Sequence, residues 1–401
     1  MNTKIKIEES LSNTVVKLNK KILFLYASSG SGHQKAAQAI KEALLAQIQD
    51  IEMMDIEALK FSHPNLSKAV HHVYMILVTG LSGFYDFLWD NIAIEKRIAW
   101  LRKIINEKSL DKFEELFNSF PAQIAVCTQA LPCGFLSTLK AKRGFDFKLI
   151  AVITDYDVHA YWLYKNVDIY CVPTILAKDK LISRGIPAEK IKITGIPVRL
   201  QFGLLKENIE IAKQQIGINH ALKSVLIMGG SYGIGPVNQI IENLDKTKED
   251  FTMLVVTGNN KKLYQSLQKE IKKVKKDVKL FGYTEDLAKL MQASDVLITK
   301  PGGITVSEAL CFGTPMIITR GIRGQESANF NYLTKEGAAI GVNNPADIAK
   351  EFINLVRNQA RLEAMRKNAL RISHPGAAMK VSQLIKSFLK YSPADKTVTP
   401  P

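Results

Sequence analysis

Cysteine, tryptophan and long apolar runs are all scarce in this chain of 401 residues. The four cysteines lie in apolar segments without C-x-x-C spacing, which argues against a disulfide framework or a zinc site and favours a reducing compartment. The first residues, with Lys4, Lys6, Glu8 and Glu9, are too polar for a signal peptide. We therefore expect a folded cytoplasmic protein, and its length favours two domains.

Acidic residues are also in short supply, with 38 Asp and Glu against 54 Lys and Arg, a net charge of +16. A charge of this size favours an anionic partner, either nucleic acid or acidic lipid. The sequence has no zinc-finger spacing, no RNA-binding aromatic motif and no arginine-rich arm. We therefore expect no nucleic acid partner and favour an anionic phospholipid surface.

Residues 64–105 supply the aromatic and cationic mixture that such a surface requires. Residues 69–85 contain no Asp, Glu, Lys or Arg, but the run is too short and too interrupted to span a bilayer. Its rings and the basic residues that follow suit the headgroup layer of a membrane. An amphipathic helical pair packed on its own domain is the alternative, and both can hold. The predicted membrane residues here are Phe84, Trp89, Trp100 and Arg102.

The apolar periodicity predicts strand-then-helix units repeated in two halves, typical of parallel sheets covered on both faces. We expect two Rossmann-like α/β domains facing a central cleft, at residues 1–200 and 201–375. A helix at about 376–391 is expected to cross back to the first domain, and residues 392–401 are expected to be disordered. The predicted strands are 21–27, 51–55, 122–128, 147–154, 169–172, 191–194, 224–228, 252–257, 278–281, 296–299 and 316–319.

Two glycine-rich loops in the second half suit a nucleoside diphosphate. In Lys300–Glu308, Gly302 and Gly303 let the backbone approach an anion at a helix start, and Glu308 is placed to accept both hydroxyls of a ribose. The loop Gly229–Gly235 leads into a helix near Pro236 and favours a backbone nest for phosphate. Four glycines there exceed what a tight turn needs.

A third glycine loop, Ser28–His33, opens the first helix after the first strand. A dinucleotide fingerprint would carry a third glycine where Lys35 stands, so NAD binding is disfavoured. A lone histidine is more often a cap or a surface residue. Within this glycine loop, however, we interpret His33 as a neutral imidazole that takes a proton from an alcohol.

Polar residues follow another apolar strand at Thr154–His159. Asp155 comes directly after the strand and is expected to point into the cleft, whereas Asp157 is interpreted as a helix-capping residue. His159 and Trp162 are predicted to line an acceptor pocket. No further cluster converges on this loop, so no metal site is predicted.

Downstream, Gln325 and Glu326 place an amide beside a carboxylate at a helix start, a pair that can read the hydroxyls of a sugar. A capped surface helix would explain the same residues. We assign the pair to a sugar site only because the other loops indicate the same kind of ligand.

Taken in order, these motifs resemble the GT-B lipid glycosyltransferases, the group of the monogalactosyldiacylglycerol synthases and the bacterial processive diacylglycerol glucosyltransferases. The resemblance covers roughly residues 20–390. The motifs that carry it are Gly30–His33, Thr154-Asp155, Ile193–Val198, the Gly229 loop, Gly282–Thr284, Lys300–Glu308 and Gln325-Glu326.

The resemblance implies transfer of glucose or galactose from a UDP-sugar to diacylglycerol, with inversion, by a peripheral enzyme at the cytoplasmic face of the cell membrane. It implies His33 as the base, with Asp155 as the second catalytic residue, and neither a metal nor another cofactor. The implied donor-binding residues are Gly229, Gly230, Ser231, Gly233, Phe281, Tyr283, Gly302, Gly303, Ile304, Thr305, Glu308, Gln325 and Glu326.

Three other functions stay open at this point. A more distant relative of the same plan transfers N-acetylglucosamine to a lipid-linked precursor. A UDP-sugar epimerase has the same two-domain plan, and a non-catalytic UDP-sugar sensor would keep the glycine loops without needing His33.

Overall fold

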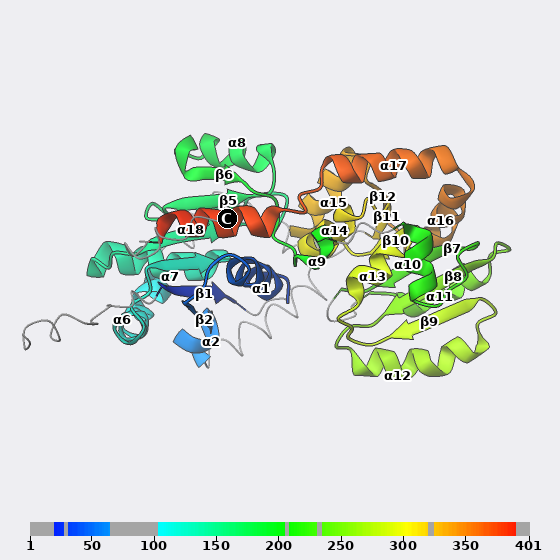
Figure 1. The fold of residues 1–401 in the computed structure, drawn as a ribbon, viewed down its shortest axis with the longest axis horizontal. Helices are drawn as coiled ribbons and strands as arrows, with labels where there is room; N and C mark the ends of the chain where they lie inside the picture. The colour runs from blue at the N-terminus through cyan, green and yellow to red at the C-terminus, as the bar shows by residue number, and fades with distance from the viewer. Residues whose placement is uncertain are drawn as a thin grey trace, which may run out of the picture.

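The computed structural model describes residues 20–27, 31–64, 103–204, 208–230, 235–319 and 325–389, with the side chains of Ser31, Leu204 and Gln325 left out. Several predicted residues lie outside this description, namely Ser231, Gly233, Phe84, Trp89, Trp100, Arg102 and the tail 392–401. Figure 1 shows two α/β units joined side by side. Within the described residues, no helix combines the length and the apolar character that crossing a membrane requires.

The first unit is a six-stranded, wholly parallel sheet with the strand order β2-β1-β3-β4-β5-β6. Its strands are β1 (Lys20–Tyr26), β2 (Ile51–Glu57), β3 (Ile124–Cys127), β4 (Lys148–Val152), β5 (Ile169–Val172) and β6 (Ile191–Ile193). Its described helices are α1 (Ser31–Leu45), α2 (Ala58–Ser62), α6 (Leu110–Ser119), α7 (Ala130–Arg143) and α8 (Ile175–Ser183), with short 3₁₀ turns at Ala160–Trp162 and Ala188–Lys190.

The second unit repeats the plan with the order β12-β11-β10-β7-β8-β9, again all parallel. Its strands are β7 (Lys223–Met228), β8 (Phe251–Val256), β9 (Asp277–Phe281), β10 (Val296–Thr299), β11 (Met316–Thr319) and β12 (Ala339–Val342). Its helices are α9 (Gln201–Leu204), α10 (Ile209–Gln215), α11 (Val237–Asp245), α12 (Lys261–Glu270), α13 (Leu287–Gln292), α14 (Gly303–Cys311), α15 (Gln325–Lys335), α16 (Ile348–Arg357) and α17 (Gln359–Arg371), with 3₁₀ turns at Ile271–Lys273 and Pro345–Asp347.

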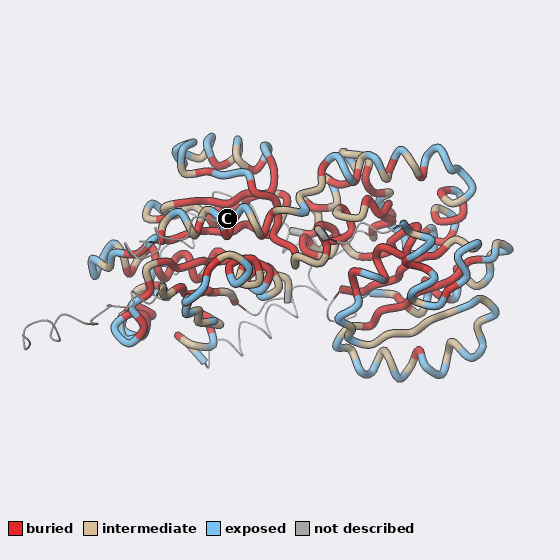
Figure 2. The backbone as a smooth tube through the Cα atoms, in the orientation of Figure 1, coloured by how far each residue is buried: buried red, intermediate tan, exposed pale blue. Residues whose placement is uncertain are grey.

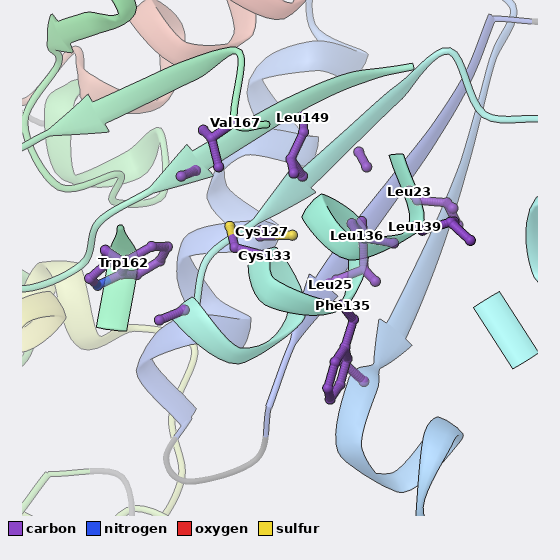
Figure 3. Close-up of a cluster of buried hydrophobic side chains, with 14 of the residues drawn as sticks. Leu23, Leu25, Cys127, Cys133, Phe135, Leu136, Leu139, Leu149, Trp162 and Val167 are labelled. Atoms are coloured by element: carbon purple, nitrogen blue, oxygen red, sulfur yellow. The ribbon is translucent and has the colours of Figure 1, made fainter. Parts of the chain in front are cut away.

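The central strands of each sheet are buried on both faces, as their continuous apolar runs require. Along β1, Leu23 and Leu25 pack into one core cluster, whereas Ile22 and Phe24 pack into the cluster on the opposite face. Figure 2 shows the central strands buried, the edge strand β9 mostly intermediate and the outer sides of the helices exposed. In Figure 3 the first cluster gathers strand residues with α7, and the buried Cys127 and Cys133 lie within it. All four cysteines are unpaired.

The last helix, α18 (Ala377–Phe388), leaves the second unit and packs against α1 of the first. Val381 and Ile385 join the core cluster that holds Phe24 of β1. The chain therefore crosses between the units twice, and α18 completes one face of the first sheet.

The two-sheet α/β fold predicted from the sequence is confirmed, and the strand ends differ from the prediction by a few residues at most. One strand escaped prediction. The edge strand β12 reads Ala-Ile-Gly-Val and is only partly buried, and a glycine inside so short a run weakens the strand signal. The domain boundaries themselves stay a prediction.

Candidate active site

The first turns of α1 and α14 approach each other between the two sheets. A side chain built on Gly303 would place its Cβ 2.1 Å from the carbonyl oxygen of Thr154, and one built on Gly32 would lie 3.4 Å from Ile304. The absence of a side chain at Gly303 is thus required by contact between the units. The start of a helix leaves backbone N–H groups without partners inside the helix, and such groups favour an anion.

His33 lies in the first turn of α1 and is held by the strand ends of its own sheet. Its Nδ1 is 2.8 Å from the carbonyl oxygen of Thr128 and 3.0 Å from Oγ1 of Thr154. A carbonyl oxygen can only accept, so Nδ1 carries the hydrogen and Nε2 keeps its lone pair. Burial lowers the pKa of His33 to about 4, and the hydrogen bond to Thr128 raises it by a smaller amount. The imidazole is therefore neutral at pH 7 and able to accept a proton.

Asp155 follows β4 and is bonded across the boundary between the units. Asn329 of α15 donates from Nδ2 to Oδ1 of Asp155 (3.1 Å) and to the carbonyl of Pro301 (3.0 Å), and its Oδ1 accepts the backbone N–H of Tyr156 (2.7 Å). Burial raises the pKa of Asp155 to about 6, while the Asn329 hydrogen bond lowers it and the negative charges of Glu326 and Asp157 raise it.

Tyr156 is a second connection between the units. Its hydroxyl lies 2.8 Å from Oγ of Ser307 on α14, and its ring stacks on Tyr332 of α15 at 4.6 Å between centroids. The loop that carries Asp155 is therefore wedged between α14 and α15. Any movement of one unit against the other displaces Asp155 relative to the second sheet.

Glu308 lies one turn inside α14 and is 3% exposed. Its Oε2 makes no hydrogen bond within the described part of the chain, and neither does the buried Oγ1 of Thr299 at the end of β10. Burial raises the pKa of Glu308 to about 7, against lowering by the charges of Lys35 and Arg199. A buried carboxylate oxygen without a donor is costly, so a ligand with hydroxyl groups would stabilise it.

Lys300 brings a cation to the same end of the second sheet. Its Nζ donates to Oε1 of Glu326 at 2.7 Å, and its Cε would lie 2.8 Å from a Cβ built on Gly230. Gly230 has φ +71°, a conformation that glycine adopts without strain. The lysine thus lies between the Gly229–Gly230 turn and Glu326, two of the predicted donor-binding positions.

Two of the predicted donor-binding residues, Phe281 and Tyr283, lie at the end of β9 and just after it. Tyr283 is 61% exposed, and its hydroxyl donates to Oε1 of Glu285 at 2.7 Å. Arg199, in the connection between the units, bonds Glu285 at 2.7 Å and Glu42 of α1 at 2.8 Å. The carbonyl of Phe281 accepts from the backbone N–H of Thr257. Arg199 therefore ties the loop of Tyr283 to the helix that carries His33.

The predicted acceptor residues lie deeper than a pocket lining would. Trp162 is 3% exposed and belongs to the core of the first sheet, and His159 is buried against Tyr161 and Trp162. Asp157 pairs with Lys180 of α8 at 2.6 Å and accepts the N–H of Val158. The 3₁₀ turn that follows has His159 as its N-cap, so the predicted helix-capping role of Asp157 is wrong. The acceptor role of His159 and Trp162 stays a prediction.

Sequence reasoning assigned no role to Thr128, Lys300 or Asn329. Thr128 and Lys300 directly follow β3 and β10, and this position at the carboxyl end of a parallel strand was a usable signal. Asn329 lies inside α15, and two of its three partners, Asp155 and Tyr156, come from the other unit, so they arise only from the docking of the units. Among the described residues, no group of three or more His, Cys, Asp or Glu could hold a metal ion. Catalysis without metal stays a prediction.

Comparison with known proteins decides the family. Residues 33–198 match the monogalactosyldiacylglycerol (MGDG) synthase family model, and residues 209–371 match that of glycosyl transferases group 1. The chain is 32% identical to a processive diacylglycerol beta-glucosyltransferase of Bacillus pumilus, over 89% of this chain and 92% of the relative. The enzyme of the same name from Bacillus subtilis is 30% identical, over 87% of this chain and 90% of the relative. This chain belongs to the family of the processive diacylglycerol beta-glucosyltransferases.

Solved structures share the fold of this diacylglycerol glucosyltransferase family member at low identity. MurG of Acinetobacter baumannii superposes with a TM-score of 0.61 and 12% identity, covering 92% of this chain and 99% of its own. MnaA of S. aureus, solved with UDP, superposes with a TM-score of 0.57 and 14% identity, covering 92% of this chain and 97% of its own. These likenesses show the GT-B arrangement of two sheets.

Proposed function

We propose that this protein transfers a hexose from a UDP-sugar to the hydroxyl of diacylglycerol, forming a glycolipid. The observation that carries the proposal is the meeting of two helix starts between the sheets. One brings His33 with its lone pair on Nε2, and the other brings the N–H groups of α14 and the unpartnered carboxylate oxygen of Glu308. Family membership supports the same reaction.

His33 is the base in this reaction. Nε2 takes the proton of the acceptor hydroxyl while the oxygen attacks the anomeric carbon of the sugar. The bond from that carbon to the diphosphate oxygen breaks, and UDP leaves with the electron pair, so the configuration inverts. Thr128 and Thr154 keep the ring oriented throughout. Asp155 stabilises the imidazolium or the acceptor hydroxyl from the same strand edge.

The donor is held by the second unit. Glu308 accepts the ribose hydroxyls, the loops at Gly229 and Gly302 approach the diphosphate, and Glu326 reads the sugar together with Gln325. The dipole of α14 and the Lys300 ammonium offset the charge that develops on the departing diphosphate. We expect these groups to support transfer without a metal ion.

The finer assignments are glucose or galactose as the sugar and an anionic membrane at its cytoplasmic face as the location. The names of the curated relatives favour glucose. The net charge of +16 supports an anionic surface. Epimerase, sensor and N-acetylglucosamine transfer are not favoured, because the relatives at about 30% identity are diacylglycerol glucosyltransferases by name.

The test is a lipid-product assay with vesicles of diacylglycerol and anionic phospholipid. UDP-glucose, UDP-galactose and UDP-N-acetylglucosamine are offered separately, with and without EDTA. We expect a glycolipid from one hexose donor, unaffected by EDTA and lost in His33→Ala. A protein that binds UDP but makes no glycolipid from any donor would contradict the proposed function.

A further inference from the structure

An exposed aliphatic surface lies on α8 and the edge strand β6. Of the nine large hydrophobic side chains that are exposed in the described residues, four come from residues 175–193. They are Ile175 (55% exposed), Leu176 (50%), Ile182 (40%) and Ile193 (37%). We call these four residues the α8 surface. Figure 1 shows α8 on the outer side of the first sheet beside β5 and β6, and Figure 2 shows its outward side exposed.

The α8 surface begins at the edge of the sheet that carries the catalytic residues. Thr174 ends the turn after β5 and caps α8 by accepting the N–H of Ala177, so Ile175 and Leu176 open the helix at the carboxyl end of the strand. The neighbouring strand β4 leads at the same end into Thr154 and Asp155. Lys180 of α8 also bonds Asp157 of that loop at 2.6 Å. The exposed residues are thus attached to the loop beside His33.

Helical geometry puts Ile175 and Ile182 on one face, seven residues apart and roughly 10 Å along the axis. Ala177 and Leu181 on the opposite face are buried in the core of the first sheet. The helix is therefore anchored by one face and presents aliphatic side chains outward on the other. Isolated exposed aliphatic residues need no explanation, but a group on one edge marks an interaction surface.

The charge around these residues selects the partner. Residues 175–193 contain five basic residues, Lys178, Lys180, Arg184, Lys190 and Lys192, against Asp179 and Glu189, a net charge of +3. A second copy of the chain would bring the same positive charge to the interface and be repelled. Anionic headgroups complement it, while the aliphatic side chains enter the layer beneath them.

We propose that the α8 surface docks on the anionic bilayer that holds the lipid acceptor, so that the catalytic edge of the first sheet lies against the membrane. The choice of a bilayer rests on the proposed function, because diacylglycerol keeps its acyl chains in the membrane while its hydroxyl must reach His33. This contact is separate from the aromatic residues predicted at 64–105, and it places the cleft opening at the lipid surface.

The test is cosedimentation with vesicles of phosphatidylcholine and phosphatidylglycerol that contain diacylglycerol. We expect Ile175→Ser/Leu176→Ser/Ile182→Ser to bind at least about tenfold more weakly, since three aliphatic side chains lose their apolar environment. The matched control is Ile211→Ser/Leu370→Ser, which removes equally exposed aliphatic residues from α10 and α17, and its binding should be unchanged. UDP affinity should equal that of the unchanged protein in both variants, which verifies folding.

A second set of variants, which removes positive charge, separates attraction to the headgroups from insertion of the aliphatic side chains. Lys178→Gln/Lys192→Gln should weaken binding to anionic vesicles by about fivefold per lysine and leave binding to pure phosphatidylcholine unchanged. Vesicle binding by the triple serine variant equal to that of the unchanged protein would overturn the proposal. Loss of self-association in that variant, with vesicle binding kept, would instead assign the surface to a second copy.

Failure of the docking proposal can be distinguished from failure of the proposed function. In detergent micelles of diacylglycerol, where no bilayer has to be approached, the triple serine variant should keep its glycolipid synthesis. If the unchanged protein makes no glycolipid from any donor, the proposed reaction fails, yet the vesicle assay still decides the docking surface on its own.

Discussion

The two halves of this protein follow one plan and use burial in opposite ways. Each is a parallel six-stranded sheet with a helix starting at the cleft, and each buries one ionisable side chain in the first turns of that helix. In the first half, His33 is partly buried, desolvation lowers its pKa to about 4, and Nδ1 is already satisfied. In the second half, burial raises the pKa of Glu308 to about 7, and Oε2 has no donor among the described residues.

Desolvation disfavours charge in both cases, so it removes a proton from the histidine and retains one on the carboxyl group. The consequence differs in function. In the proposed reaction, His33 can accept a proton before any ligand binds, whereas Oε2 of Glu308, which has no partner among the described residues, gains partners from the hydroxyl groups of the donor. If the proposed function holds, we expect the acceptor side to be assembled in advance and the donor side to be completed by its ligand.

The largest effect is expected for His33→Ala. Removing a general base costs about 10²- to 10⁴-fold in rate, and because His33 belongs to the acceptor half, UDP affinity should not change. The measurements are kcat for glycolipid formation and calorimetric UDP binding. A variant that keeps more than about a tenth of the rate would show that the two halves do not divide the chemistry as described.

Next comes the contact between the halves, which Gly303→Ala should break. The new Cβ meets the Thr154 carbonyl at 2.1 Å, whereas a Cβ at Gly302, with φ −71°, meets nothing within 4 Å. We expect Gly303→Ala to lower kcat/KM by about 10²-fold, since misplacement by about 1 Å can cost this much, and to enlarge the radius of gyration in solution scattering.

Gly302→Ala is the matched control and should leave the radius of gyration unchanged. Any loss of UDP affinity in Gly302→Ala then reports the approach of the ligand to the backbone, separately from contact between the halves. Equal scattering curves for both variants would contradict the steric role of Gly303.

Glu308→Gln should weaken UDP binding by about tenfold or more, because hydrogen bonds to a charged group are worth roughly 1.5–3 kcal/mol. A carboxylate accepts from both ribose hydroxyls, so UDP affinity of the unchanged protein should rise as pH rises through about 7. The variant should lack this pH dependence in calorimetric titrations between pH 5.5 and 8.5.

Without UDP, the stability of the folded protein should fall as pH rises, the opposite of the change in UDP affinity. The folded-state pKa of Glu308, about 7, lies above its ordinary value of 4.5, so the folded state loses stability as pH rises through that interval. Glu308→Gln should therefore raise the melting temperature at pH 8 and have little effect below pH 4.5. A lower melting temperature at pH 8 would mean that the carboxylate has a partner.

The smallest effect is expected for Asn329→Ala, which removes the hydrogen bonds that join α15 to the Asp155 loop. The Asn329 hydrogen bond lowers the pKa of Asp155 against the raising effects of burial, Glu326 and Asp157. Its loss should raise that pKa further. The acidic limb of the kcat profile should move to higher pH, with kcat lowered a few-fold. The conservative Asn329→Gln offers a rescue, and an unshifted limb would indicate a purely structural residue.

Much of the fold was predictable because its determinants are local. The apolar runs of β1, β7 and β10 and the glycines that follow them specify strand, turn and helix in order. Edge strand β12 was missed because it is short and partly exposed. The predicted position of Asp155 at a strand end was informative, since carboxyl ends of parallel strands gather at one edge of a sheet.

By itself, the sequence determined the two parallel sheets, the family and the residue types at the cleft, since these depend on patterns within single strand-turn-helix units. Only the tertiary structure decided that Gly303 faces Thr154, that Asn329 reaches Asp155, and that burial moves the pKa values of His33 and Glu308 in opposite directions. The physical reason is that burial and contact between distant residues depend on how two separately folded sheets pack, which no local pattern encodes.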